Sequence, residues 1–148
     1  MDSRRRAALL LLAISGGLLL GALWFQYLGG LAPCEMCLWQ RWAHLAVIAA
    51  AGATLLMPRL LPLALVAIAT SAGLALLHVG VELRWWEGPT RCSSNLAGSG
   101  DLMGDLLAAP LVRCDQIPWS FLGLSMAGWN LAITLAAMAA AAWTWRRR

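Results

Sequence analysis

The chain has 148 residues, of which 61% are hydrophobic and 12% are charged, and its mean hydropathy is +0.71. Soluble domains contain roughly a quarter charged residues, and the apolar residues here gather in runs long enough to cross a bilayer, which takes about 20 residues. Composition therefore excludes a soluble domain and indicates an integral membrane protein. All eleven basic residues are arginines. Because seven of them flank the apolar runs, and no loop alternates basic with aromatic residues, the net charge of +4 does not indicate nucleic acid as a partner.

The first predicted span follows a short basic head. A run without charge ends in Trp24, Phe25 and Tyr27, aromatic residues that are typical of a membrane interface. A cleaved signal peptide also starts with basic residues, but its apolar core is shorter and ends at small residues. We therefore predict a retained span over approximately residues 7–28.

Glycines and a proline mark a tight outer turn over residues 29–35. The second span is predicted over residues 36–57 and the third over residues 60–81. The short connection between them contains Arg59, which fits the cytoplasmic face of a membrane.

Residues 82–118 are the polar part of the chain and are predicted to form the second outer loop. Apolar residues at helical spacing over residues 101–109 predict a short amphipathic helix lying on the membrane, with an ordinary loop as the alternative. A fourth span over residues 119–145 is rich in small residues that allow close helix packing. The predicted fold class is an all-α membrane protein. It is a four-helix transmembrane bundle in a single domain, residues 1–148, with the short amphipathic helix in the second outer loop.

Charge sets the predicted orientation of the four spans. The two termini and the connection between the second and third spans carry seven arginines and Asp2, a net charge of +6, whereas the outer segments carry four arginines and six acids, a net charge of −2. The positive-inside rule therefore places both termini in the cytoplasm and all four cysteines outside. An even number of external cysteines suggests an oxidising compartment. We predict a multi-pass protein of the bacterial inner membrane with periplasmic cysteines.

Two pairs of cysteines carry the candidate chemistry: Cys34 and Cys37 in a C-x-x-C motif, and Cys92 and Cys114 in the second outer loop. A c-type haem needs a histidine directly after the C-x-x-C motif, but Leu38 stands there. A zinc site usually pairs two tight cysteine hooks, so no metal is expected. Four cysteines allow three pairings, and two inert structural disulfides remain an alternative. Two unlike dithiols favour electron transfer by thiol–disulfide exchange, and without a nucleotide or flavin motif the acceptor should come from the membrane.

Helical spacing predicts further polar residues beside the first cysteine pair. Residues three, four and seven apart share a helix face, so Cys34, Cys37, Arg41 and His44 are predicted to lie on one stripe. The helix N-terminus and Arg41 would both favour a thiolate. The alternatives are that Arg41 anchors to lipid headgroups and that His44 bonds to a neighbouring helix. His78, near the outer end of the third span, is a further candidate.

The sequence resembles the disulfide bond formation protein B (DsbB) family of membrane oxidoreductases. The matching stretches, in chain order, are Ala22-Leu23-Trp24-Phe25-Gln26-Tyr27; Pro33-Cys34-x-x-Cys37 with Arg41; Gly80-Val81-Glu82-Leu83; and Cys114-x-x-x-x-Trp119-x-Phe121-Leu122-Gly123-Leu124-x-Met126. The resemblance implies a four-helix bundle that reoxidises a periplasmic thioredoxin-like dithiol oxidase, DsbA. It also implies that two electrons pass to a membrane quinone, either ubiquinone or menaquinone.

By position, the resemblance also implies a role for each cysteine. Cys92 would form the mixed disulfide with the partner, and Cys114 would attack the inner pair through Cys34. Cys37 would face the quinone ring, where Arg41 would polarise a quinone oxygen and stabilise the thiolate. The quinone-side residues predicted in this way are Arg41, His78 and His44.

Two other functions are compatible with the sequence. A thiol–quinone enzyme similar to vitamin K epoxide reductase would share the four-helix plan and the C-x-x-C chemistry. A non-enzymatic four-span protein with structural disulfides belongs to a different class. A small transporter should place an acidic residue inside a span, but the predicted spans contain none before Glu82, at the interface.

Overall fold

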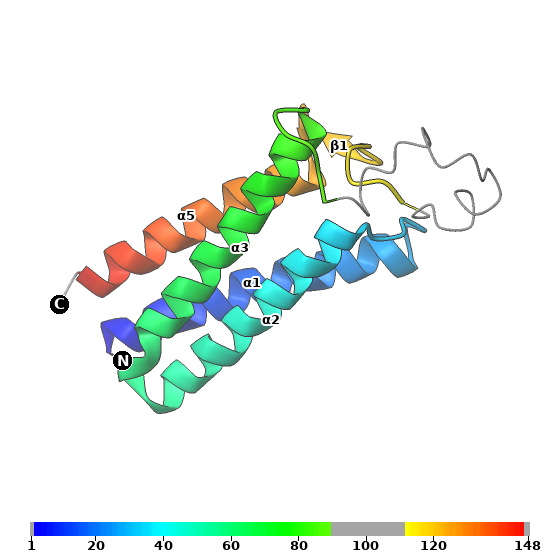
Figure 1. The fold of residues 1–148 in the computed structure, drawn as a ribbon. Coiled ribbons are helices and arrows are strands. Elements are labelled where there is room, and N and C mark those ends of the chain that lie inside the picture. The colour runs from blue at the N-terminus through cyan, green and yellow to red at the C-terminus, as the bar shows by residue number, and fades with distance from the viewer. Residues whose placement is uncertain (1, 90–111, 147–148) are drawn as a thin grey trace, which may run out of the picture.

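A computed structural model describes residues 2–89 and 112–146. The described residues form a bundle of four long helices with a short 3₁₀ turn and a two-stranded hairpin (Figure 1). The elements are α1 (Ser3–Tyr27), α2 (Glu35–Leu56), η1 (Pro58–Leu60), α3 (Leu61–Glu82), β1 (Ser120–Phe121), β2 (Leu124–Ser125) and α5 (Met126–Arg146). Successive helices pack against one another, and α5 returns to α1, so the four helices form a closed ring.

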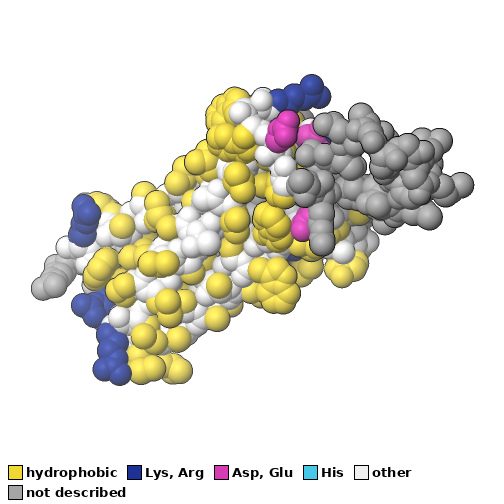
Figure 2. Space-filling view, viewed as in Figure 1, with side chains coloured by type: hydrophobic (Ala, Val, Ile, Leu, Met, Phe, Trp, Pro, Cys, Tyr) yellow, Lys and Arg dark blue, Asp and Glu magenta, His cyan; other side chains and the backbone are white. Residues whose placement is uncertain are grey.

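Small side chains fill the centre of the bundle, and large apolar side chains face outward. The outward-facing residues include Leu20, Leu56 and Leu63, each more than half exposed. The outer surface of the helices is accordingly apolar over most of the bundle's length (Figure 2). The alanines among the buried core residues are Ala7, Ala8, Ala43, Ala50, Ala51, Ala64, Ala72, Ala75, Ala127, Ala137 and Ala141. This arrangement suits a lipid environment, where close helix contact drives association in place of burial from water.

Three helical segments are long and apolar enough to cross a membrane: Ser3–Tyr27, Pro58–Glu82 and Met126–Arg146. This finding confirms the prediction of an α-helical membrane protein. Helix α2 has 22 residues, a length that could also cross a membrane, but it is not among the three because it carries several polar side chains. The predicted span over residues 36–57 therefore stays a prediction.

The predicted fourth span, residues 119–145, is wrong at its start. Residues 120–125 form a β-hairpin, pairing Phe121 with Leu124, and the helix begins only at Met126. The two turn residues, Leu122 and Gly123, have φ values of 51° and 79°, as the tight turn of a two-residue hairpin requires. Apolar character suggested a span here, but a helix cannot continue through two successive residues with positive φ.

The two ends of the bundle differ in charge. The described termini lie together at one end (Figure 1), where dark blue arginine side chains gather, whereas the acidic side chains gather at the opposite end (Figure 2). The segment from α1 to α2 and the segments on either side of residues 90–111 meet at that acidic end (Figure 1). Cys92 and the amphipathic helix predicted over residues 101–109 lie outside the described residues.

Candidate active site: a dithiol beside a buried cavity

The C-x-x-C pair lies at the start of α2. Cys34 is the residue that caps the helix, and its Sγ accepts a hydrogen bond from the backbone N–H of Cys37 at 3.2 Å. One helical turn then brings the two sulfur atoms to 2.6 Å, and both cysteines carry free thiols. The hydrogen bond to the Cys37 side chain, together with burial, raises the pKa of the Cys34 thiol. The pair is therefore a dithiol whose two sulfurs lie close enough to form and break a disulfide with little movement.

Cys114 packs directly beside this dithiol. It is fully buried and shares a cluster with Cys34, Met36 and Val81. It is disulfide-bonded, in contrast to Cys34 and Cys37. The structure therefore brings three of the four predicted cysteines together.

An ion pair holds the chain on both sides of Cys114. The guanidinium of Arg113 donates two hydrogen bonds to the carboxylate of Asp115, at 2.9 and 2.7 Å. This two-point contact lowers the pKa of Asp115. It also closes a short loop in which Cys114 points inward while its two charged neighbours remain partly exposed.

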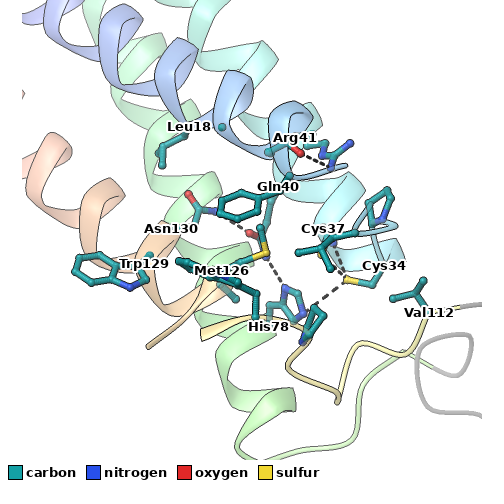
Figure 3. A pocket seen from close by; sticks show the side chains of 18 of the residues that line it. Leu18, Cys34, Cys37, Gln40, Arg41, His78, Val112, Met126, Trp129 and Asn130 are labelled. Carbon is teal, nitrogen blue, oxygen red and sulfur yellow. Dashed lines mark hydrogen bonds between the residues drawn. The ribbon is translucent and has the colours of Figure 1, made fainter. Parts of the chain in front are cut away.

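A cavity of about 470 Å³ opens beside the dithiol, between helices α1, α2, α3 and α5 (Figure 3). This volume lies in the range of small-molecule binding sites, which are mostly apolar with a few convergent polar groups. The apolar lining includes Leu18, Val112, Met126 and Trp129. The polar lining residues are Cys34, Cys37, Gln40, Arg41, His44, His78, Glu82, Arg113, Gln116 and Asn130.

Aromatic rings from three elements form one wall of the cavity. The rings of Phe25 on α1 and Trp119 lie 4.9 Å apart, and Trp119 stacks on Phe121 at 6.2 Å. The indole N–H of Trp129 on α5 donates to the backbone oxygen of Phe121 at 3.0 Å. The hairpin is thus fastened to α1 and α5 at the level of the dithiol.

Arg41 lines the cavity one helical turn beyond Cys37, and its hydrogen bonds run to α1. Nη1 donates to Oε1 of Gln26, and Nη2 donates to the backbone oxygen of Ala22 at 3.2 Å. A guanidinium has five N–H donors in a fixed plane, so these contacts orient Arg41 and leave other donors for the cavity. In the structure the guanidinium of Arg41 is therefore paired with the side chain of Gln26 and a helix carbonyl.

A chain of buried polar side chains runs from the dithiol into the bundle. Nε2 of His78 lies 3.7 Å from Sγ of Cys34, and Nδ1 of the same ring lies 2.9 Å from Nε2 of Gln40. Oε1 of Gln40 accepts from Asn130 at 2.7 Å. His44 bonds to Oδ1 of Asn130 at 2.9 Å and to Ser71 at 3.1 Å. The structure thus places His78 at the dithiol and uses His44 to connect α2 with α3 and α5.

Glu82 closes the cluster on the α3 side. One carboxylate oxygen lies 3.9 Å from Nε2 of His78, and the other accepts a hydrogen bond from Ser125 on β2. The Ser125 hydroxyl in turn accepts from the backbone N–H of Gly128 at 3.0 Å. These contacts tie the hairpin and the start of α5 to the helix that carries His78.

The ligand atoms of Cys34, Cys37 and His78 lie within 4.8 Å of one another, a spacing that a metal ion could bridge. A metal-binding histidine normally donates its second ring N–H to an acceptor. Nδ1 of His78 instead faces the amide nitrogen of Gln40, which can only donate. The surroundings of His78 therefore favour thiol chemistry over a resident metal.

Five side chains of the site were not among the predicted site residues: Gln26, Gln40, Glu82, Ser125 and Asn130. Two signals could have indicated some of them. A polar residue in an apolar span requires a partner, which applies to Gln40 and Asn130. Residues four apart share a helix face, which places Glu82 beside His78.

The fold and the site define a helical membrane protein with a dithiol at the mouth of an internal cavity. The family model described as disulfide bond formation protein DsbB matches residues 4–144, and the chain belongs to this family. It is 33% identical to the disulfide bond formation protein B of Pasteurella multocida over 143 residues, which covers 88% of this chain and 80% of the relative. It is 35% identical to that of Shewanella frigidimarina (82% and 78% covered) and 34% identical to that of Xanthomonas axonopodis pv. citri (78% and 74% covered).

Proposed function

We propose that this protein is a dithiol:quinone oxidoreductase of the bacterial inner membrane that reoxidises a periplasmic DsbA-like partner. One observation carries the proposal. A free dithiol, Cys34 and Cys37, opens into a largely apolar cavity of about 470 Å³, with Cys114 buried against Cys34 on the other side. An inner pair with a second cysteine on one side and a cavity on the other can exchange disulfides with a protein and electrons with a lipid-soluble molecule.

In the proposed relay, the partner's thiolate attacks the disulfide of Cys92 and Cys114 at Cys92 and forms a mixed disulfide. The electron pair of the broken bond leaves on Cys114, whose thiolate attacks Cys34 of the oxidised inner pair, breaks the Cys34–Cys37 disulfide and releases Cys37 as a thiolate. Later exchanges release the oxidised partner and rejoin both pairs. Over one cycle the partner dithiol loses two electrons and two protons, and the quinone gains both. A two-electron couple changes by about 1.4 kcal/mol per 30 mV, so a respiratory quinone can drive the formation of a strongly oxidising disulfide.

The residues that line the cavity fit a quinone. An apolar wall with aromatic rings suits the ring and tail of a lipid-soluble molecule, and Arg41 has unused N–H donors for a quinone oxygen. We propose that Cys37 and Arg41 contact the quinone head, with Gln26 holding the guanidinium in place. Bound quinone supplies the two-electron sink. The chain itself orients the two thiols and buries that of Cys34.

The charge distribution supports a defined orientation in the membrane. Arg4, Arg5, Arg6, Arg59 and Arg146 belong to the termini and to the connection between α2 and α3. The positive-inside rule then supports cytoplasmic termini and periplasmic cysteines. In this proposal α2 also crosses the membrane, as the second of four spans, and its polar residues are satisfied by contacts with the other three helices.

The test follows quinone reduction by absorbance, with the purified protein in detergent and a reduced thioredoxin-like dithiol partner. Cys37→Ser and Cys92→Ser should each abolish turnover, whereas Gly73→Ala, a substitution in α3 with open space around it, should retain it. Full activity of either cysteine variant would refute the relay and favour structural disulfides. Labelling with a membrane-impermeant thiol reagent tests the orientation, and labelling of Cys92 from the cytoplasm would contradict it.

A further inference from the structure

The polar chain that ends at Cys34 has a direction, which follows from the chemistry of its two amides. An amide nitrogen only donates and an amide oxygen only accepts. Asn130 uses its nitrogen to donate to Oε1 of Gln40 at 2.7 Å, and its oxygen faces Nε2 of His44 at 2.9 Å. Gln40 therefore has its nitrogen left for His78, 2.9 Å from Nδ1. With the two amides in these orientations, every bond from His44 to His78 points toward the dithiol.

This direction determines the tautomer of His78. A neutral imidazole has one ring nitrogen that donates and one that accepts. Nδ1 accepts from Gln40, so the proton is on Nε2. That nitrogen lies 3.7 Å from Sγ of Cys34, and the ring also has a hydrogen bond to the backbone of Cys114.

We propose that His78, held as the Nε2–H tautomer by Gln40 and Asn130, is the hydrogen-bond donor that stabilises a thiolate on Cys34 and keeps the backbone of Cys114 beside it. This inference rests on the proposed relay, in which Cys34 leaves Cys114 as a thiolate and later re-forms its disulfide with Cys37 while two electrons pass to the acceptor. His78 touches the reacting sulfur. Gln40 and Asn130 are positioning residues that act through the imidazole.

The relay needs such a donor because Cys34 is a poor site for negative charge. Its side chain is 4% exposed, and burial disfavours a thiolate. The donors that reach its sulfur include the backbone N–H of Cys37 at 3.2 Å, the backbone N–H of Met36 and the ring of His78. When the bond between Cys34 and Cys114 breaks, its electron pair stays on the sulfur of Cys34, and these donors stabilise the negative charge there. No further reactant is required, because the thiolate of Cys92 attacks Cys114 and forms the new disulfide bond as Cys34 leaves.

Besides Cys34, the titratable groups Cys37 from α2 and Glu82 from α3 lie near the Nε2–H of His78. Cys114, from the segment before the hairpin, is disulfide-bonded and contributes its backbone. Glu82 has a second partner in Ser125, which holds one of its oxygens away from His78. A neutral donor at Nε2 is therefore compatible with both the sulfur and the carboxylate.

The first test reads the tautomer directly, without quinone or partner. The chain contains two histidines, so ¹⁵N NMR of histidine-labelled protein in detergent gives two rings, and a His44→Gln variant assigns them. We expect a protonated Nε2 and an unprotonated Nδ1 at His78, and a mixture of tautomers in Gln40→Leu. A proton on Nδ1, or an imidazolium at neutral pH, would overturn the proposal, as would an unchanged tautomer in Gln40→Leu.

The second test measures the thiolate at Cys34. A glutamine amide nitrogen can occupy the place of Nε2, whereas asparagine is too short, so His78→Gln and His78→Asn form a matched pair. Iodoacetamide modification of Cys34 in a Cys37→Ser background is followed by mass spectrometry across pH. His78→Asn should slow modification at neutral pH about tenfold, the lower end of what a hydrogen bond to a charged group supplies, and His78→Gln should restore it. Equal rates in both variants, with unchanged melting temperatures, would refute the role of His78 even if the protein reduces quinone.

Discussion

Asn130 makes the most contacts in the polar chain, and its replacement by leucine should destabilise the bundle more than any single surface change. Its side chain donates to Gln40 at 2.7 Å and accepts from His44 at 2.9 Å and Thr134 at 3.2 Å. Hydrogen bonds between membrane helices contribute about 0.6 kcal/mol each on average, so three of them give a loss of about 2 kcal/mol. The loss of stability is larger still, because the substitution leaves polar groups of Gln40 and His44 without a hydrogen-bond partner, and both residues are buried.

The measurement is the free energy of unfolding in mixed micelles, from tryptophan fluorescence during titration with a denaturing detergent. Thr144→Val is the matched control, because Thr144 lies on the same helix and its hydroxyl donates to the carbonyl of Ala140 one turn earlier, within α5. A double-mutant cycle with His44→Phe isolates the contact between Asn130 and His44. A coupling energy of zero, or an Asn130→Leu variant as stable as the control, would show that the chain contributes nothing to stability and that His78 must be oriented in another way.

Three further predictions concern separate parts of the molecule. Gly80→Ala should destabilise by about 1–3 kcal/mol, because an added Cβ would lie 2.0 Å from the ring of Trp86, whereas Gly73→Ala in the same helix should be neutral or stabilising. Equal melting temperatures for the two variants would contradict this. Gln26→Leu should raise the KM for quinone more than it lowers kcat, because it releases Arg41; an unchanged KM in the absorbance assay would argue against this role. Arg113→Gln should return the pKa of Asp115 toward its ordinary value. The ion pair adds stability above that ordinary pKa and loses it as the pH falls through the lowered pKa of the folded protein. In a plot of melting temperature against pH, this contribution should therefore be absent from the variant, and identical acid profiles of the two proteins would contradict it.

The helices could be predicted from hydropathy because lipid selects for long apolar runs, and the bounds of α1 and α3 lie within a few residues of the predicted spans. The start of the last helix could not be predicted in this way. Hydropathy measures side chains, whereas the hairpin depends on backbone angles at Leu122 and Gly123 and on the pairing of Phe121 with Leu124. An apolar residue such as Leu122 at positive φ leaves no signal in composition.

The cysteine motif indicated the chemistry, but the neighbours of the cysteines depend on tertiary contacts. Spacing along α2 predicted that Cys37 and Arg41 would lie near one another, and both line the cavity. It could not show that Gln40, rather than Arg41, meets His78, since that contact joins residues 38 positions apart. Arg41 and Gln40 are adjacent in sequence, yet they point to different helices, α1 and α3.

The polarity of α2 connects the assembly of the bundle with the assembly of the site. Gln40, Arg41 and His44 are polar residues within α2, and each is satisfied by a different neighbour: His78 on α3, Gln26 on α1 and Asn130 on α5. A polar side chain in lipid costs free energy until it finds a partner. The full set of partners exists only when all four helices have packed, and the same packing brings His78 to Cys34 and Arg41 to the cavity. The residues that disfavour α2 as an isolated span therefore ensure that the dithiol is oriented only in the fully packed bundle.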